Sequence, residues 1–149
     1  AVDLVNGSNY TWFQSNGTYP ASTPADGTTM VEFQSYWAYN GTETRLKRTT
    51  SASTVGYSNI AVDFQWLTDT GFSGAQDRVN VQWSTDGTTW ATAATVDRYS
   101  ASGQIWTTQN VQLPAGASGQ ATLYIAFDFI SEFGNNCHLD LVHITAVGP

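Results

Sequence analysis

Three segments of this chain alternate apolar and polar residues with a period of two, and this pattern constrains the fold most. The segments are 60–67, 79–84 and 123–130, each with apolar side chains at every second position. Successive side chains of a β-strand point to opposite faces of a sheet, so each segment is expected to be a strand with one buried face. No window has the spacing of an amphipathic helix. The chain is therefore predicted to be all-β.

Turn-forming dipeptides fall between the expected strands. Asp86-Gly87 separates residues 79–84 from 90–96 and predicts a hairpin, and Asn-Gly pairs at 6–7, 16–17 and 40–41 predict further turns. About nine or ten strands at this spacing are typical of a two-sheet antiparallel β-sandwich of the jelly-roll type. A length of 149 residues fits one such domain, from 1 to 149.

Charged residues are scarce and mostly acidic. They make up 11% of the chain, and the net charge is −7. Such a surface repels phosphate backbones and anionic lipid, so neither nucleic acid nor a membrane is expected as a partner. The polar surface must come from Thr, Ser, Asn, Gln and Gly, a composition common in secreted modules. The protein is therefore predicted to be secreted or extracellular.

The cysteine, the histidines and the acidic residues show no catalytic pattern. Cys137 has no partner for an internal disulfide and is expected to be buried. His138 and His143 would point to opposite faces of a strand, with His143 on the solvent side. Glu32 and Asp128 could meet across a sheet face, but no hydrolase motif accompanies them. The chain is predicted not to be an enzyme.

Aromatic residues are the best candidates for a binding site. They make up 13% of the chain, including six tryptophans. In an extended segment Tyr36, Trp37 and Tyr39 cannot all face the core, so some are expected at the surface. Exposed rings stack on the apolar C–H faces of sugars, and Asn40 and Arg45 are expected nearby to hydrogen-bond hydroxyl groups. The alternative is that these rings pack under a loop.

The other aromatic residues divide between candidate site and core. Trp12, Tyr99 and Trp106 are secondary ligand-binding candidates, because Trp12 and Trp106 each adjoin another large apolar residue and only one of two adjacent strand residues faces the core. The tryptophans expected in the core are Trp66, Trp83 and Trp90.

Two segments of the second half resemble a known superfamily. Residues 77–90 read Asp-Arg-Val-Asn-Val-Gln-Trp-Ser-Thr-Asp-Gly-Thr-Thr-Trp, and residues 134–142 read Gly-Asn-Asn-Cys-His-Leu-Asp-Leu-Val. They resemble segments of MAM-like jelly-roll domains, including bacterial adhesin-type modules, and of several carbohydrate-binding modules. The resemblance covers 58–147 and implies a jelly roll. The chain lacks the paired cysteines of animal MAM domains, which argues against an animal receptor role.

Asp140 is the candidate metal ligand. Its period-two neighbours are Val142 and Ile144, and a carboxylate on their face needs a cation or several hydrogen bonds. In the jelly rolls that this chain resembles, the matching aspartate often helps to hold a structural calcium near the N-terminal strand. The resemblance therefore implies calcium here, with Asp3 as a second oxygen donor if the first and last strands pair. The alternative is that Asp140 caps backbone amides.

Asp69 and Asp77 flank a glycine-rich loop. Two carboxylates on one loop could bind calcium, but aspartates at such positions more often form turns that fix the loop. The sequence favours the turns.

Together these features predict a non-catalytic carbohydrate-binding module of a secreted polysaccharide-acting enzyme or surface protein, with a polysaccharide or glycan as its ligand. The alternative is a MAM-like adhesion domain whose exposed aromatic residues contact a protein surface.

Overall fold

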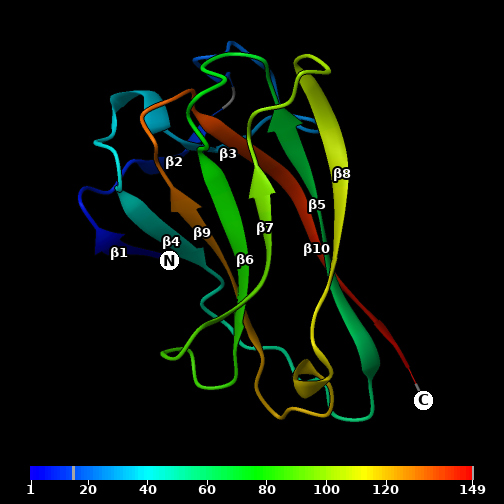
Figure 1. Ribbon diagram of the computed structural model, residues 1–149. Helices are drawn as coiled ribbons and strands as arrows, with labels where there is room; N and C mark the ends of the chain where they lie inside the picture. Colours follow the sequence, from blue (N-terminus) through cyan, green and yellow to red (C-terminus); the bar gives the residue numbers. More distant parts are fainter. Residues whose placement is uncertain (15, 149) are drawn as a thin grey trace.

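Two antiparallel sheets of five strands face each other in the computed structural model, which describes residues 1–14 and 16–148 (Figure 1). The first sheet has the order β1 (Val2–Asn6), β4 (Glu43–Lys47), β9 (Tyr124–Ile130), β6 (Arg78–Ser84), β7 (Ala91–Asp97). The second has the order β2 (Thr11–Gln14), β3 (Met30–Phe33), β10 (Cys137–Val147), β5 (Ser58–Thr68), β8 (Ile105–Gln112). Two single-turn 3₁₀ helices, η1 (Ser35–Trp37) and η2 (Ala115–Ala117), complete the fold. The predicted all-β sandwich is confirmed.

Alternating side chains of the two sheets meet in a core rich in aromatic rings. Phe127 of β9 packs edge-on against Phe64 of β5, with ring centroids 5.1 Å apart, and Phe129 stacks on Trp66 at 6.3 Å. Burial of each large apolar side chain contributes about 1.5–3 kcal/mol, so this layer holds the sheets together. Cys137 is buried beside it, as predicted.

The tryptophans expected in the core divide into three cases. Trp66 is fully buried, and Trp83 packs partly against the core cluster. Trp90 was expected in the core and lies outside it, with its ring centroid 5.4 Å from the Arg45 guanidinium carbon. The reason is that Trp90 belongs to the turn before β7, where the strand alternation does not yet apply.

Strand pairing corrects two expectations. β1 pairs with β4 and not with β10, so the first and last strands belong to different sheets. Glu32 of β3 and Asp128 of β9 also lie in different sheets and cannot meet across one sheet face. Alternation in a strand encodes which face is buried, but it does not encode which strand lies alongside.

Three connections gather at one end of the sandwich, the upper end in Figure 1: the β5–β6 loop (69–77), the β9–β10 loop (131–136) and η1. The C-terminal half of β10 runs toward the opposite end. In the described part of the chain, no helix is long and apolar enough to cross a membrane.

Candidate functional site

Four aromatic side chains form a cleft at the end where these connections gather. Tyr36 and Trp37 come from η1, Phe72 from the β5–β6 loop and Phe133 from the β9–β10 loop, around a cavity of about 320 Å³. Trp37, Phe72 and Phe133 are each more than half exposed, at 57%, 52% and 59%. We refer to these four side chains as the aromatic cleft. Mostly apolar concavities of this size bind small ligands.

The rings of the cleft also support one another. Tyr19 stacks on Tyr36 with centroids 4.0 Å apart and planes 5° from parallel. Trp37 meets Tyr36 edge-on at 5.2 Å, and Phe72 meets it at 6.0 Å. Such pairs contribute about 0.5–1.5 kcal/mol each beyond burial. The rings are therefore held in place while their outer faces remain accessible.

Three aromatic residues at this end have a left-handed backbone. The φ angles are 45° at Tyr19, 48° at Phe72 and 60° at Phe133. Bulky side chains rarely adopt this region, and each instance costs on the order of 1–3 kcal/mol. Glycine adopts this region without that cost. Three large rings in or beside one cleft thus occupy unfavourable backbone positions.

A buried ion triad lies beneath the cleft. Arg98 has no exposed surface, and it donates to Asp69 Oδ1 at 2.9 Å and to Asp77 Oδ2 at 3.0 Å. Burial lowers the pKa of Arg98, but the hydrogen bond and charge of Asp69 and the charge of Asp77 outweigh it, so the pKa is raised. The guanidinium also donates to the carbonyl oxygens of Gly71, Phe72 and Ala75. The triad thus fixes the loop that carries Phe72.

Asp77 connects the triad to η1 and the β9–β10 loop, which carry the other residues of the cleft. Its Oδ1 accepts the backbone N–H groups of Glu132 at 2.8 Å and Gly134 at 3.1 Å, which flank Phe133. The same oxygen accepts the hydroxyl of Ser35, the first residue of η1. One buried carboxylate therefore positions both η1 and the β9–β10 loop.

A second buried network anchors the segment that carries Tyr19. Glu32 accepts the backbone N–H of Thr18 at 2.9 Å, and Asn136 donates to the Thr18 carbonyl at 2.9 Å and to Glu32 at 3.1 Å. The Asn136 side-chain oxygen accepts the backbone N–H of Tyr36 at 2.9 Å. Both sides of the Tyr19–Tyr36 stack are thus fixed from below, which preorganises the cleft.

Two of the predicted binding residues, Tyr36 and Trp37, line the cleft. The segment was expected to be extended, but its first part forms η1, because the chain turns sharply after β3 ends at Phe33. Trp37 and Tyr39 are the exposed side chains of the segment, which confirms that some of its aromatic residues lie at the surface. Tyr39, at 76% exposure, and Asn40 follow the cleft directly and do not line it.

Arg45 lies away from the cleft, on the outer face of the first sheet. Its Nε donates to Gln82 Oε1 at 2.7 Å, and its guanidinium approaches Asp128 at 3.9 Å. Asp128 is 1% exposed, and burial, followed by the neighbouring Glu43 carboxylate, raises its pKa to about 7. Arg45 therefore contacts Gln82 and Asp128 on this sheet face and does not contact the cleft.

Trp12, Tyr99 and Trp106 also lie outside the cleft lining. Trp12 is half-buried in β2, opposite Glu32. Trp106 is half-buried in β8 and donates Nε1–H to the Thr23 carbonyl at 3.2 Å. Tyr99 is half-buried next to Arg98. A binding role for these three stays a prediction.

Asp3 of β1 and Asp140 of β10, the two expected calcium ligands, lie in different sheets of the sandwich. Asp3 pairs with Lys47 Nζ at 2.7 Å in the first sheet. Asp140 accepts the backbone amides of Ala25, Asp26 and Leu141 at 2.9, 3.3 and 2.8 Å, so it caps amides. Within residues 1–14 and 16–148, no group of three or more His, Cys, Asp or Glu side chains is arranged to hold a metal. Stabilisation by calcium stays a prediction.

The remaining polar candidates behave as structural groups. Asp69 accepts the N–H of Gly71 at 2.7 Å, which confirms the predicted turn. His138 is buried with Nε2 3.1 Å from Glu32, whereas His143 is exposed as predicted. Buried polar side chains of this kind need such partners.

Sequence reasoning missed Tyr19, Phe72 and Phe133. Each lies beside a glycine or proline: Tyr19 precedes Pro20, Phe72 follows Gly71 and Phe133 precedes Gly134. An aromatic residue that adjoins a turn-forming residue and lies outside any alternating segment was the one sequence pattern that could have indicated exposure in a loop. The loops of Phe72 and Phe133 are held by Arg98 and Asp77, and the segment of Tyr19 by Glu32 and Asn136, which no local pattern reveals.

The fold is similar to those of carbohydrate-binding and adhesin domains. TmCBM61, solved in complex with β-1,4-galactotriose, shares 11% identity at a TM-score of 0.64, over 99% of this chain and 88% of that chain. A cleaved adhesin domain of Lys-gingipain from Porphyromonas gingivalis shares 17% identity at a TM-score of 0.72, over 99% and 90%. A carbohydrate-binding module of the β-sandwich superfamily shares 11% identity at a TM-score of 0.60, over 97% and 56%.

Identities this low establish a shared fold. At that level the resemblance to carbohydrate-binding and adhesin-type sandwiches is confirmed. No protein-family model matches the sequence, and a search of curated proteins finds no match.

Proposed function

We propose that this protein is a non-catalytic, extracellular module that binds a glycan in the aromatic cleft. The observation that carries the proposal is the set of exposed rings held at strained backbone positions by buried polar anchors. Folding alone does not favour such an arrangement, because the rings remain in water and their φ angles are unfavourable. A similar fold that holds β-1,4-galactotriose supports the choice of ligand class.

The chemistry of the cleft suits stacking on a neutral sugar. Apolar C–H faces pack on Trp37, Phe72 and Phe133, and Tyr36, whose ring stacks on Tyr19, supplies a hydroxyl group for hydrogen bonding. The preorganised loops reduce the entropy lost on binding. The paired carboxylates of a glycoside hydrolase are not part of this lining, so no reaction is proposed.

The test is binding to soluble β-1,4-galactan, arabinoxylan and mixed-linkage β-glucan, measured by affinity electrophoresis and isothermal titration calorimetry. At least one polymer should bind, and Trp37→Ala should weaken that binding about tenfold or more, because truncation of a tryptophan that anchors a binding site costs about 2 kcal/mol or more.

Tyr39→Ala is the matched control, because Tyr39 is also aromatic and exposed but does not line the cleft. It should leave affinity within about twofold. If none of a broad panel of polysaccharides binds, the glycan proposal is wrong. If both variants lose affinity equally, the placement of the binding site in the aromatic cleft is wrong.

The second candidate is adhesion to a protein surface. The similarity to a gingipain adhesin domain favours it, and exposed Trp and Tyr residues also serve as anchors in protein interfaces. A protein ligand that binds through Trp37, with no glycan bound, would support this candidate.

A further inference from the structure

β10 leaves the strand beside it halfway along its length. It pairs with β3 only from Cys137 to Leu139. Leu141 then has a φ of 49°, and the register with β5 shifts between Asp140 and His143. A bulge of this kind bends the strand that carries it. β10 therefore diverges from β3, and the space between the two sheets is open along this side of the sandwich.

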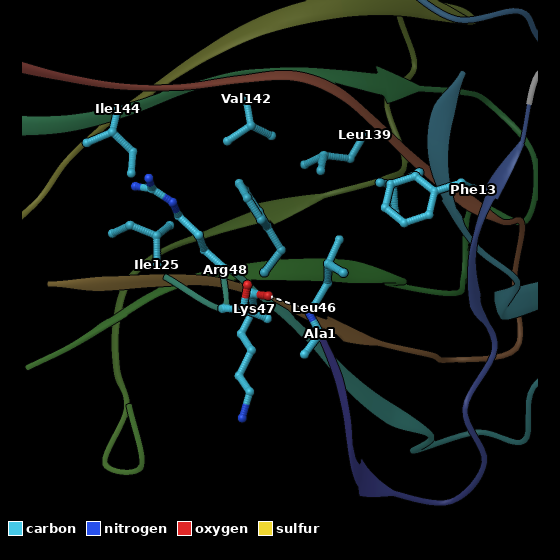
Figure 2. A pocket seen from close by; sticks show the side chains of 12 residues that line it. Ala1, Phe13, Leu46, Lys47, Arg48, Ile125, Leu139, Val142 and Ile144 are labelled. Carbon is cyan, nitrogen blue, oxygen red and sulfur yellow. Dashed lines mark hydrogen bonds between the residues drawn. The ribbon is translucent and has the colours of Figure 1, made fainter. Parts of the chain in front are cut away.

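An apolar groove occupies this opening. Figure 2 shows the side chains of Leu139, Val142 and Ile144 from β10 facing Leu46 and Ile125 of the first sheet. The groove encloses about 360 Å³, and its other apolar lining residues are Phe13, Val31 and Phe127. Phe13 and Val142 are 69% and 43% exposed. Water in such a groove finds few hydrogen-bonding partners, so its displacement by an apolar ligand is favourable.

A cationic side chain, Arg48, lies at one end of the groove. Arg48 directly follows β4, and its backbone N–H donates to the Ile125 carbonyl at 3.0 Å. In Figure 2 its guanidinium extends toward Ile144, whereas the Lys47 side chain extends away from the apolar residues. The Phe13 ring lies at the opposite end. The groove is thus apolar along its length and positively charged at one end.

The Arg48 guanidinium is available for an anionic ligand. The other basic side chains, Arg45, Lys47, Arg78 and Arg98, each form an ion pair with a carboxylate. Within residues 1–14 and 16–148, Arg48 forms none. A guanidinium can donate two parallel hydrogen bonds to a carboxylate. Since the net charge of −7 disfavours anions elsewhere on the surface, the charge of Arg48 selects a ligand with an anionic group at this end.

We propose that the groove binds a free fatty acid, a linear alkyl carboxylate, with its chain along the apolar lining and its carboxylate on Arg48. A methylene group occupies about the volume of one water molecule in the liquid, about 30 Å³, so the groove accommodates a chain of about ten carbons. Thr49, which also lines the groove, carries a hydroxyl donor next to Arg48. The groove shares no lining residue with the aromatic cleft, so this site is independent of glycan binding.

Calorimetric titration with hexanoate, octanoate, decanoate, dodecanoate and tetradecanoate, each below its micelle concentration, tests the proposal. One molecule should bind per chain. The affinity should rise about fourfold with each added methylene up to decanoate, because each buried methylene contributes that factor. It should level off beyond dodecanoate, whose chain exceeds the groove.

Arg48→Met tests the role of the cation. It should weaken decanoate binding at least about tenfold, because it removes the charged hydrogen bonds, and should leave binding of the uncharged 1-octanol within about twofold. Arg78→Met is the matched control, because it removes the same charge from a residue that does not line the groove. It should bind both ligands like the wild type.

Val142→Asp tests the position of the chain, and Val55→Asp is its matched control. Both valines are exposed and both substitutions add one negative charge, but Val55 does not line the groove. Val142→Asp alone should abolish decanoate binding, and far-UV circular dichroism and the melting temperature confirm that each variant is folded.

Three outcomes would overturn the proposal. The first is that no alkyl carboxylate binds saturably. The second is that Arg48→Met or Val142→Asp binds decanoate as tightly as its control. The third is that the chain binds phosphatidylglycerol vesicles through Arg48 and decanoate does not compete, which would assign the groove to a membrane surface.

Discussion

At the scale of single residues, Phe133 shows how the cleft departs from what stability alone would select. Its ring is 59% exposed, and its φ of 60° belongs to the region that glycine adopts most easily. The backbone N–H of the next residue, Gly134, donates to the buried Asp77 carboxylate, and this hydrogen bond holds the Phe133 backbone in its conformation. Removal of the ring can therefore separate binding from folding.

Phe133→Gly and Phe133→Ala test this separation as a pair. Both remove the ring and should weaken glycan binding about three- to tenfold. Glycine also relieves the backbone strain, so Phe133→Gly should be more stable than Phe133→Ala by about 1 kcal/mol. Urea denaturation and calorimetric titration measure the two effects. Equal stability of the two variants would contradict the strain argument.

Asp128 makes the free energy of unfolding decrease as pH rises. Burial, followed by the charge of Glu43, raises its pKa from 3.8 to about 7, whereas the unfolded chain keeps the ordinary value. Between these pH values the native state retains a proton that the unfolded state has lost. The contribution of this carboxyl to the free energy of unfolding is therefore full below about pH 4 and falls as pH rises to about 7.

Asp128→Asn should remove this decline, which urea denaturation between pH 4 and 8 measures. Asp97→Asn, an exposed carboxylate on β7, should retain it. A decline that persists unchanged in Asp128→Asn would show that another group causes it.

At the scale of elements, the ion triad of Arg98, Asp69 and Asp77 connects η1 to the β5–β6 and β9–β10 loops. These connections contain no disulfide, since the one cysteine of the chain lies in β10. Their conformation therefore depends on buried charge. A buried ion pair from which one partner is removed leaves a charge without compensation, which destabilises strongly.

Arg98→Met should lower the free energy of unfolding by about 3–5 kcal/mol, because it leaves the Asp69 and Asp77 carboxylates buried without a cation. Arg78→Met is the matched control. It removes an ion pair with Glu132 at 2.8 Å whose side chains are partly exposed, and such pairs contribute less than about 1 kcal/mol. Urea denaturation compares the two, and losses of similar size would contradict a special role for the triad.

At the scale of the whole molecule, the sequence predicted the architecture better than the site. The alternation in residues 60–67, 79–84 and 123–130 identifies strands and their buried faces, since burial on one face requires a period of two. The partner of β1, the bulge at Leu141 and the convergence of three loops depend on contacts distant in sequence. The roles of Phe72 and Arg98 could therefore not be predicted.

The placement of the anchors beneath the cleft has a consequence for how such a domain can diversify. The aromatic side chains of the loops extend from backbone that is held by Asp77, Arg98 and Asn136. These three side chains are buried and do not line the cleft. Tip residues can be exchanged one at a time while the loop geometry is retained. The scaffold therefore suits engineering of new specificities by mutagenesis confined to positions 19, 37, 72 and 133.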